Sequence, residues 1–493
     1  MQTAPNSTQR DYVRHRPESS LLYRVVQENF ETLTANAKSR SGGQSFPVHV
    51  YREVEEYLTC GILANGFVRV SCGDCKNEKL VAFSCKRRGF CPSCGGRRMN
   101  EVALHLVDKI LPKVPVRQWV LSFPFSVRYA LAYNPSLVTQ VLSVYIRIIS
   151  NWYFKAARKN GIRGKTAAIT FVQRFGGAIN LNVHFHSLFL DGVFTFDQDK
   201  PKFTPVFPPS DEQIVTLVSR INARVSSLLE KRGYELNDFS EDPFAHEQPV
   251  LAGILSSSVQ NRIALGEREG LRVRKIGGEY SIGNAYRVSP RCALSDGFSL
   301  HADVQIKRKD RQKLERLCRY AARPPIALER MSQREDGKIL YRLKTRYSDG
   351  TTHVLFDPLE LVEKAVALIP PPRANLLRYH GLLAPNSKRR SQIVPSNSEK
   401  KKAKSPYPEQ TKWAELLKKS FSIDVLKCSK CGGKMRVLSV IKDSAIARRI
   451  LEAKGMWAEP PKKSPPRAPP ELELGDHLPS DDFSQILAPD QFG

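Results

Sequence analysis

The stretch from Asn182 to Gly192, NVHFHSLFLDG, places two histidines one residue apart inside an otherwise apolar run. Side chains two positions apart on a β-strand point to the same face of the sheet. If this run is a strand, His184 and His186 share one face, and Val183 and Phe185 lie on the opposite, apolar face. A lone histidine in a strand is usually a core residue, whereas two imidazoles on one face can also bind a metal ion.

A second run, from Thr166 to Phe175, has the same β-rich composition, and Gly176-Gly177 between the runs is typical of a two-residue hairpin loop. With such a loop, Gln173 lies opposite Asn180. Directly paired residues share a face, so Gln173 is the nearest upstream candidate for a third metal ligand, and Asn182 is the alternative. Two imidazoles and an amide oxygen suit Mg²⁺ or Mn²⁺ with open positions, and zinc is possible from the imidazoles alone.

The surrounding sequence alternates between helical and extended patterns, which predicts an α+β fold around an antiparallel sheet. Val116 begins a further expected strand, VRQWVLSF. Helices are expected at 102–111, 137–154, 211–232 and 310–323, from apolar residues at helical spacing and from prolines that end two of them.

Composition narrows the function. The 493 residues carry 77 Lys+Arg against 49 Asp+Glu, a formal net charge of +28 that suits a polyanion, most often nucleic acid. A membrane surface or a ribosome would attract the same charge. The sequence shows no run near the roughly 18 apolar residues of a membrane span, and its first residues lack the apolar core of a secretory signal. We therefore expect a cytoplasmic protein whose ten cysteines are metal ligands or core residues.

Two cysteine knuckles, Cys72-x2-Cys75 and Cys91-x2-Cys94, are separated by fifteen residues. Two such pairs can complete a four-sulfur structural zinc site, and Cys85 between them could replace one ligand. A third pair, Cys428-x2-Cys431, has no second pair nearby. It could be a relic, borrow ligands from elsewhere, or bind nothing. Basic residues crowd the N-terminal knuckles and form either a DNA-contacting surface or a solvated basic face: Lys86, Arg87, Arg88, Arg97 and Arg98.

These patterns divide the chain into six segments. We expect an N-terminal helical segment (1–59), a zinc-binding domain (60–100), a catalytic domain (101–385), a basic linker (386–411), a small C-terminal module with the third cysteine pair (412–457) and a proline-rich, disordered tail (458–493).

Several motifs together resemble one enzyme family. They are CGILANGFVRVSCGDC, SCKRRGFCPSC, ITFVQRFGGAINLNVHFH, LERLCRYAARPPIALERM, GTTHVLFDPLELV, PPRANLLRYHGLLAP and IDVLKCSKCGG, which span most of 21–457. The chain resembles rolling-circle transposases of the insertion-sequence-91-like (ISCR-like) family, and NVHFH resembles the His-hydrophobic-His motif of HUH single-strand endonucleases. The resemblance implies an HUH-like antiparallel sheet flanked by helices, an N-terminal zinc-binding domain, single-stranded or hairpin transposon-end DNA as partner, and a nucleoid-associated location in the bacterial cytoplasm.

The resemblance further implies a tyrosine nucleophile that forms a 5′-phosphotyrosine, and it assigns this role to Tyr320. Two-tyrosine relatives carry a second tyrosine one turn earlier, where this chain has Arg316, so the resemblance is to the single-tyrosine branch. Cations on the same helix are candidates for binding the scissile phosphate, and they are Lys313, Arg316, Arg319 and Arg323.

Two further residues compete for a place in the site. Tyr379, followed by His380, is a second candidate nucleophile, and His301 shortly precedes the tyrosine helix. The alternative to an enzyme is a non-catalytic, zinc-dependent DNA-binding protein, such as a regulator or an inactive transposase. An RNA-binding or ribosome-associated protein also fits the charge, but it leaves the histidines and Tyr320 without a shared purpose.

Overall fold

A central antiparallel sheet organises the molecule. The computed structural model describes Arg14 and residues 16–234, 242–277, 290–395 and 427–467. The sheet has seven strands in the order β15-β4-β5-β3-β10-β9, with β11 also paired to β3. The strands are β3 (Val116–Ser122), β4 (Ala167–Phe175), β5 (Leu181–Leu190), β9 (Cys292–Ser295), β10 (Phe298–His301), β11 (Gln305–Ile306) and β15 (Leu377–Gly381). The expected α+β architecture is confirmed.

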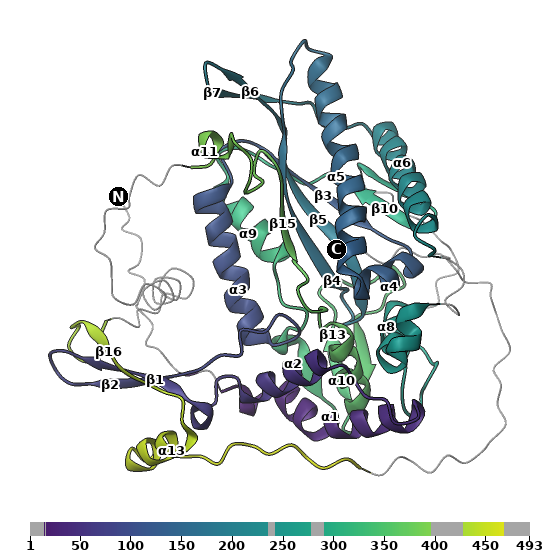
Figure 1. The fold of residues 1–493 in the computed structure, drawn as a ribbon. Helices are drawn as coiled ribbons and strands as arrows, with labels where there is room; N and C mark the ends of the chain where they lie inside the picture. Colours follow the sequence, from purple (N-terminus) through teal and green to yellow (C-terminus); the bar gives the residue numbers. More distant parts are fainter. Residues whose placement is uncertain (1–13, 15, 235–241, 278–289, 396–426, 468–493) are drawn as a thin grey trace, which may run out of the picture.

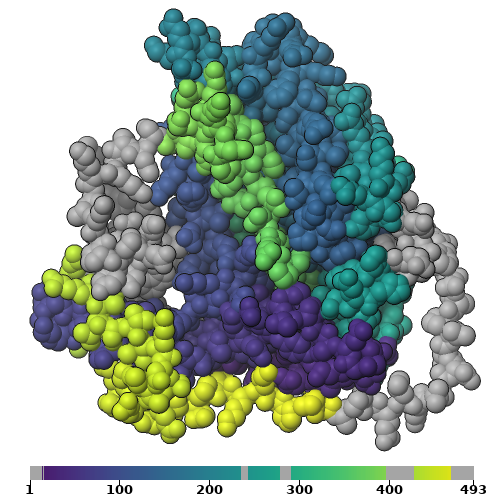
Figure 2. Space-filling view, viewed as in Figure 1, coloured from purple at the N-terminus to yellow at the C-terminus, as the bar shows by residue number. Residues whose placement is uncertain are grey.

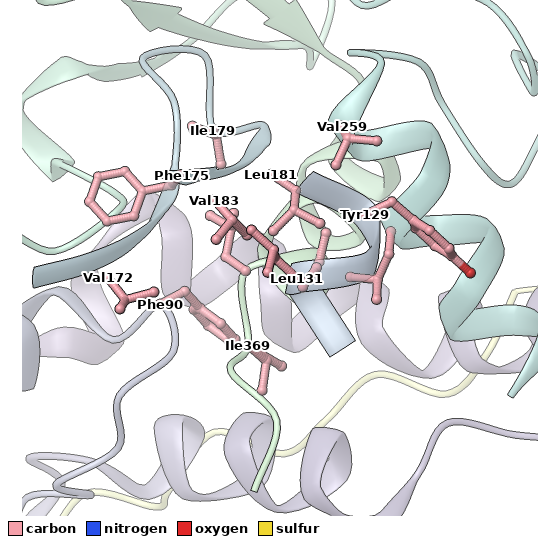
Figure 3. Close-up of a cluster of buried hydrophobic side chains, with 14 of the residues drawn as sticks. Phe90, Tyr129, Leu131, Val172, Phe175, Ile179, Leu181, Val183, Val259 and Ile369 are labelled. Atoms are coloured by element: carbon pink, nitrogen blue, oxygen red, sulfur yellow. The ribbon is translucent and has the colours of Figure 1, made fainter. Parts of the chain in front are cut away.

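Helices cover both faces of this sheet, as Figure 1 shows. Helices α5 (Pro135–Arg158) and α6 (Asp211–Glu230) lie on one side, where Val183 and Phe185 of β5 join the larger hydrophobic core. Helices α3 (Pro92–His105) and α9 (Arg311–Ala321) lie on the other side, where Leu188 packs with Leu314 of α9. Because side chains alternate along β5, His184 and His186 lie on the same face as Leu188, which is the face that α9 covers. Figure 3 shows part of the larger core, with Phe90, Leu181 and Val183 pointing inward.

The expected helices are confirmed, and local capping explains their ends. The Asn134 side chain accepts the first-turn amide of α5 at 3.0 Å, Ser210 and Gln213 form a capping box at the start of α6, and the Asp310 carboxylate caps α9 at 3.0 Å. The helix expected from Val102 begins earlier, at the second cysteine knuckle, because Pro92 takes the first helical position of α3. It continues through η3 (Leu106–Ile110).

The hairpin between β4 and β5 differs from the prediction. The loop is longer than two residues, since Phe175 pairs with Leu181 and the Gly176 amide donates to the Asn180 carbonyl at 2.9 Å. Ile179 takes a left-handed conformation (φ 59°) and is fully buried in the core, which anchors the longer loop (Figure 3). Gln173 consequently pairs with His184 rather than with Asn180. The register differs by an even number of residues, so Gln173 keeps the predicted face.

Segments from both ends of the chain form a second, three-stranded sheet in the order β16-β1-β2. Its strands are β1 (Phe67–Cys72), β2 (Glu78–Ala82) and β16 (Met435–Ile441), and helix α13 (Ser444–Ala453) packs on one face. The described part of the expected C-terminal module, residues 427–457, thus belongs to the same structural unit as the expected zinc-binding domain, and residues 412–426 lie outside the described residues. Figure 2 shows the C-terminal residues in yellow against the N-terminal ones.

Residues 458–467 of the expected disordered tail follow the surface of α1 (Leu21–Arg40). The Arg467 amide donates to Thr32 Oγ1 at 3.1 Å, and Lys463 pairs with Glu31 at 2.5 Å. Residues 468–493 lie outside the described residues, as do 396–411 of the expected basic linker.

The remaining elements include two smaller sheets and several short helices. A four-stranded sheet has the order β12-β13-β14-β8, and β6 pairs with β7. In chain order these elements are η1 (Pro17–Ser19), α2 (Val48–Thr59), η2 (Leu63–Asn65), α4 (Phe125–Tyr133), β6 (Gly192–Asp197), β7 (Lys200–Pro205), α7 (Pro243–Glu247), α8 (Pro249–Val259), β8 (Arg274–Ile276), η4 (Leu328–Arg330), β12 (Met331–Gln333), β13 (Ile339–Arg342), β14 (His353–Phe356), α10 (Pro358–Ala367) and α11 (Arg390–Ile393). Among the described residues, none of the helices combines the length and apolarity that a membrane crossing requires.

Candidate active site

The two histidines of β5 face each other on the α9 side of the sheet. The Nε2 atoms of His184 and His186 are 3.0 Å apart, and both side chains are buried. The Asn182 carbonyl lies 2.8 Å from Nδ1 of His184. A carbonyl oxygen can only accept a hydrogen bond, so Nδ1 must be the donor in this pair. His184 therefore carries its proton on Nδ1, which leaves the Nε2 lone pair available as a metal ligand.

A second side chain, missed by the sequence reasoning, orients His186. The carboxamide nitrogen of Gln118 on β3 is 2.8 Å from Nδ1 of His186. In this arrangement the Gln118 amide donates to Nδ1 of His186, so His186 carries its proton on Nε2 and donates it to Nε2 of His184. A half-turn of the Gln118 carboxamide would present its oxygen to Nδ1 instead and would free Nε2 of His186 for a metal ion. Strand pairing was the available signal, because Gln118 alternates onto the histidine face of the neighbouring strand.

Burial keeps both imidazoles neutral. It lowers the pKa of His184 to about 4, helped by the nearby Arg323 and Arg128 cations. The pKa of His186 lies well below its ordinary value for the same reason, with further contributions from His184 and Arg323. Neutral imidazole is the form that binds metal ions.

Gln173 connects the histidines to the tyrosine helix. It lies directly opposite His184, and its Nε2 donates to the Ala321 carbonyl at the end of α9 at 3.3 Å. Its Oε1 atom is buried and has no hydrogen-bond partner within the described part of the chain. A buried, unpaired amide oxygen is costly. Gln173 is the cross-strand partner of His184 and shares the face of both histidines, so this oxygen fits the role of a third ligand to a hard cation.

Tyr320 on α9 lies beside the histidine pair. Its ring is 5.8 Å from the His186 ring, centroid to centroid, in an edge-on arrangement. Arg323 and Lys344 each place a cation 4.3 Å from the centre of the Tyr320 ring. Lys344 gave no local signal in the sequence, because it follows β13 and is not part of the tyrosine helix.

The four basic residues predicted around Tyr320 have different environments. Arg323 also lies 5.3 Å from the Phe175 ring, and its Nη1 is buried without a hydrogen-bond partner among the described residues. Arg319 instead pairs with Glu315 at 2.6 Å. Lys313 and Arg316 are exposed. Of the four, only Arg323 stacks on the Tyr320 ring.

The competing residues lie elsewhere on the sheet. Tyr379 is on β15 opposite Ile169, where it packs in the smaller core and contacts Arg390 at 5.3 Å. His380 points to the other face and lies 3.1 Å from Thr170 Oγ1, so it does not support Tyr379. His301 on β10 pairs with Val120 on β3, and Val120 pairs with His186 on β5. His301 therefore lies two strands away from His186, in line with it across the sheet.

The cysteines form two clusters, and the predicted pairing of the two N-terminal knuckles in one site is wrong. The first cluster contains Cys60, Cys85, Cys91 and Cys94, whose sulfur atoms all lie within 4.8 Å of one another. Cys60 was missed because it belongs to no CxxC pair. Hydrogen bonds among the thiols lower the pKa of Cys94 and raise those of Cys85 and Cys91. The four sulfurs thus compete for negative charge, and a bound divalent cation would allow all of them to ionise.

The other knuckle belongs to a second cluster. Cys72 and Cys75 meet Cys428 and Cys431, again with all four sulfurs within 4.8 Å. Of the alternatives for the C-terminal pair, the structure matches the one in which it borrows ligands from elsewhere in the chain.

The four arginines around the Cys91-x2-Cys94 knuckle all make contacts inside the chain. Arg87 pairs with Glu56, and Arg97 contacts Ser84. The other two donate to backbone carbonyls, Arg88 to Ala374 at 2.7 Å and Arg98 to Lys86 at 2.8 Å. Their contact with DNA stays a prediction.

Comparison with known proteins identifies the family. Residues 26–123 match a family described as a transposase zinc-binding domain of the insertion-sequence-91 type, and residues 167–391 match one described as a putative transposase. No curated protein and no solved structure shows significant similarity. The zinc-binding match and the cysteine clusters support structural zinc, and a transposase binds and processes DNA. The two matches, which together cover about two thirds of the 493 residues, place the chain among the insertion-sequence-91-like transposases.

Proposed function

We propose that this transposase nicks and rejoins single-stranded or hairpin DNA at the ends of a mobile element, through a covalent bond between Tyr320 and DNA. The observation that carries the proposal is the position of Tyr320, 5.8 Å from His186 between ring centres, although 134 residues separate the two in the sequence. A tyrosine, two neutral histidines and unpaired cationic groups in one place suit phosphodiester chemistry.

The reaction requires no nucleotide cofactor. The Tyr320 hydroxyl loses its proton and attacks the scissile phosphorus, the bond from phosphorus to the 3′-oxygen breaks, and that oxygen takes up a proton. The products are a 5′-phosphotyrosine and a free 3′-hydroxyl. Because the phosphotyrosine keeps the energy of the phosphodiester, a 3′-hydroxyl can later attack it and rejoin a strand.

The residues present fit a catalytic divalent cation. Adjacent ligands of an octahedral ion bound at about 2.1 Å lie about 3.0 Å apart, which matches the 3.0 Å between the histidine Nε2 atoms. Gln173 Oε1 supplies a third, hard oxygen donor. We therefore propose Mg²⁺ or Mn²⁺ held by His184, His186 and Gln173. Such an ion would withdraw charge from the phosphate when bound.

Two cations of the chain are placed to bind the phosphate itself. Arg323 has a buried, unpaired Nη1 next to the tyrosine ring, and Lys344 reaches the same ring from the β13 side. Arginine binds phosphate through two donors in a fixed plane, so Arg323 would orient the group for attack, whereas Lys344 adds a point charge. A single tyrosine serves the site, because Arg316 holds the position where two-tyrosine relatives have their second nucleophile.

The decisive experiment traps the covalent product. Single-stranded end DNA labelled at its 3′ end is incubated with the protein and Mg²⁺ or Mn²⁺, and the mixture is run on a denaturing gel. The wild type should shift label to the protein, while Tyr320→Phe should give no adduct, because it lacks the attacking oxygen but keeps the ring and its contacts. Tyr379→Phe is the matched control and should form adduct as the wild type does.

Two outcomes would redirect the proposal. Equal adduct with Tyr320→Phe, together with loss in Tyr379→Phe, moves the nucleophile to β15. No adduct from any form, with retained DNA binding that weakens steeply with salt, favours the non-catalytic, zinc-dependent DNA-binding protein.

A further inference from the structure

We infer that Cys72, Cys75, Cys428 and Cys431 bind a second structural zinc ion, which clasps residues 427–457 to the N-terminal hairpin of β1 and β2. In this arrangement the zinc-binding domain is completed by the other end of the chain. The family match for that domain ends at residue 123, so half of these ligands lie outside it. The inference does not depend on the proposed catalytic mechanism.

The sulfur positions suit a tetrahedral ion. Cys72 Sγ lies 3.5 Å from Cys431 Sγ, and Cys75 Sγ lies 3.5 Å from Cys428 Sγ. All four atoms lie within 4.8 Å of one another. Zinc bound to four thiolates at about 2.3 Å separates them by about 3.8 Å, whereas a disulfide joins two sulfurs at about 2.05 Å. Four sulfurs in mutual contact therefore match one shared ion better than two separate bonds.

The C-terminal pair sits in a tight loop shaped for metal binding. The Cys428 amide donates to the Gly433 carbonyl at 2.8 Å, and the Gly432 amide donates back to the Cys428 carbonyl at 2.9 Å. A Cβ at Gly433 would collide with the Asp74 carboxylate and lie 3.1 Å from Cys72 Sγ. The two knuckles thus approach too closely for a side chain between them.

The rest of the contact holds the same two segments together. Strand β16 pairs with β1 from Phe67↔Ile441 to Cys72↔Met435, so the sheet ends at the cysteines. Ala447 and Leu451 of α13 pack against the hydrophobic side of that sheet. Cys72 and Cys428 belong to a second small cluster with Val70, Val81 and Met435, so the ion would lie beside this cluster and fix the register of two strands.

The ion would join two segments that are far apart in the sequence. The sulfur pairs join residues 353 and 359 positions apart. Closing so long a loop has a large entropic cost, and a metal ion bound by both segments offsets it. Without the ion, the described part of this segment is held by the small sheet, the packing of α13, the Lys454–Glu78 ion pair and the contacts of residues 463–467 with α1.

Zinc content of the purified full-length chain provides the first test. The wild type should hold two zinc ions, one per cluster. Cys72→Ser with Cys75→Ser should lose one, and Cys428→Ser with Cys431→Ser should also lose one. The quadruple variant should still lose only one, because both pairs hold the same ion. Cys292→Ser, outside both clusters, should lose none. Loss of two ions in the quadruple variant, or of none, overturns the inference.

A cleaved chain provides the second test, and its chelation arm uses the wild-type cysteines. A protease site is inserted within residues 396–426, and the cut protein is passed over a sizing column. The C-terminal fragment should elute with the main body in zinc and separate from it after chelation. In the cut Cys428→Ser, Cys431→Ser variant it should separate without chelator. A fragment that separates in zinc, or stays after chelation, contradicts the clasp.

Discussion

The two cysteine clusters have the same ligands but different places in the chain. The first gathers Cys60, Cys85, Cys91 and Cys94, which lie within 35 consecutive residues. The second joins residues more than 350 positions apart. Three cysteines of the first cluster are buried, whereas Cys75 and Cys431 of the second are exposed. Identical sulfur chemistry thus serves a local core in one case and a long-range closure in the other.

Position also separates the clusters functionally. Cys91 and Cys94 begin α3, and α3 packs along the tyrosine helix α9. The Arg311 guanidinium at the start of α9 donates to the Leu111 carbonyl, just past η3, at 3.0 Å. The first cluster therefore supports the helix that carries Tyr320. The second lies at the sheet of β1, β2 and β16, and among the described elements no packing comparable to that of α3 joins this sheet to α9.

The largest expected effect comes from Cys91→Ser with Cys94→Ser. A structural zinc contributes about 10–16 kcal/mol in zinc-finger peptides, comparable with the whole stability of a domain, about 5–15 kcal/mol. We expect one zinc to be lost, the melting temperature to fall and the covalent DNA adduct to form at least about a hundredfold more slowly, since small misplacements of a reacting group have effects of that size.

Cys292→Ser makes the same chemical change outside both clusters and should leave all three measurements unchanged. Zinc content, thermal melts by circular dichroism and adduct rates can be measured on the same preparations. Wild-type adduct formation in the double variant would show that the first cluster does not position α9.

The clusters also show how far the sequence could predict this molecule. Alternation in NVHFHSLFLDG predicted the shared face of His184 and His186, because the strand period is fixed by backbone geometry. Knuckle spacing indicated a zinc site for the two N-terminal CxxC pairs, since it describes one tight turn, and it left the role of the C-terminal pair open. It did not reveal which pairs meet, because that depends on tertiary pairing of β1 with β16. Cys60 gave no local signal for the same reason.

In the candidate active site, too, the sequence predicted local features and missed contacts that depend on tertiary packing. Gln173 was predicted on the correct face, but its partner was wrong because the buried Ile179 lengthens the hairpin loop. Gln118 comes from the neighbouring strand β3, and Lys344 from the loop after β13, so they reach His186 and Tyr320 only in the folded chain. Periodicity thus predicts the face of a side chain, and tertiary packing decides its neighbours.

The next expected difference concerns the rate of zinc removal. Thiol reactivity follows exposure, so a mercurial reagent should release zinc in two phases, with the second cluster at least about tenfold faster. A coloured zinc indicator follows the release. Adduct formation should survive the fast phase and disappear with the slow one, because only the first cluster supports α9. A single phase, or loss of adduct in the fast phase, would remove the distinction between the clusters.

The smallest expected effect isolates the contact between α3 and the end of the tyrosine helix. A Cβ at Gly95 would lie 2.6 Å from the Pro324 Cβ, whereas a Cβ at the neighbouring Gly96 meets nothing within 4 Å. Pro324 follows Arg323, which stacks on Tyr320. Gly95→Ala should therefore lower stability by about 1–3 kcal/mol through overpacking and slow adduct formation severalfold, with both zinc ions retained.

Gly96→Ala is the matched control, one residue away on the same helix. It should raise stability by about 0.5–1 kcal/mol, because alanine favours a helix over glycine, and leave adduct formation unchanged. Denaturant unfolding and adduct rates measure both effects. The opposite signs expected for adjacent glycines make the comparison independent of general changes in α3. If both variants behave alike, the first cluster acts on Tyr320 by a route other than the contact of Gly95 with Pro324.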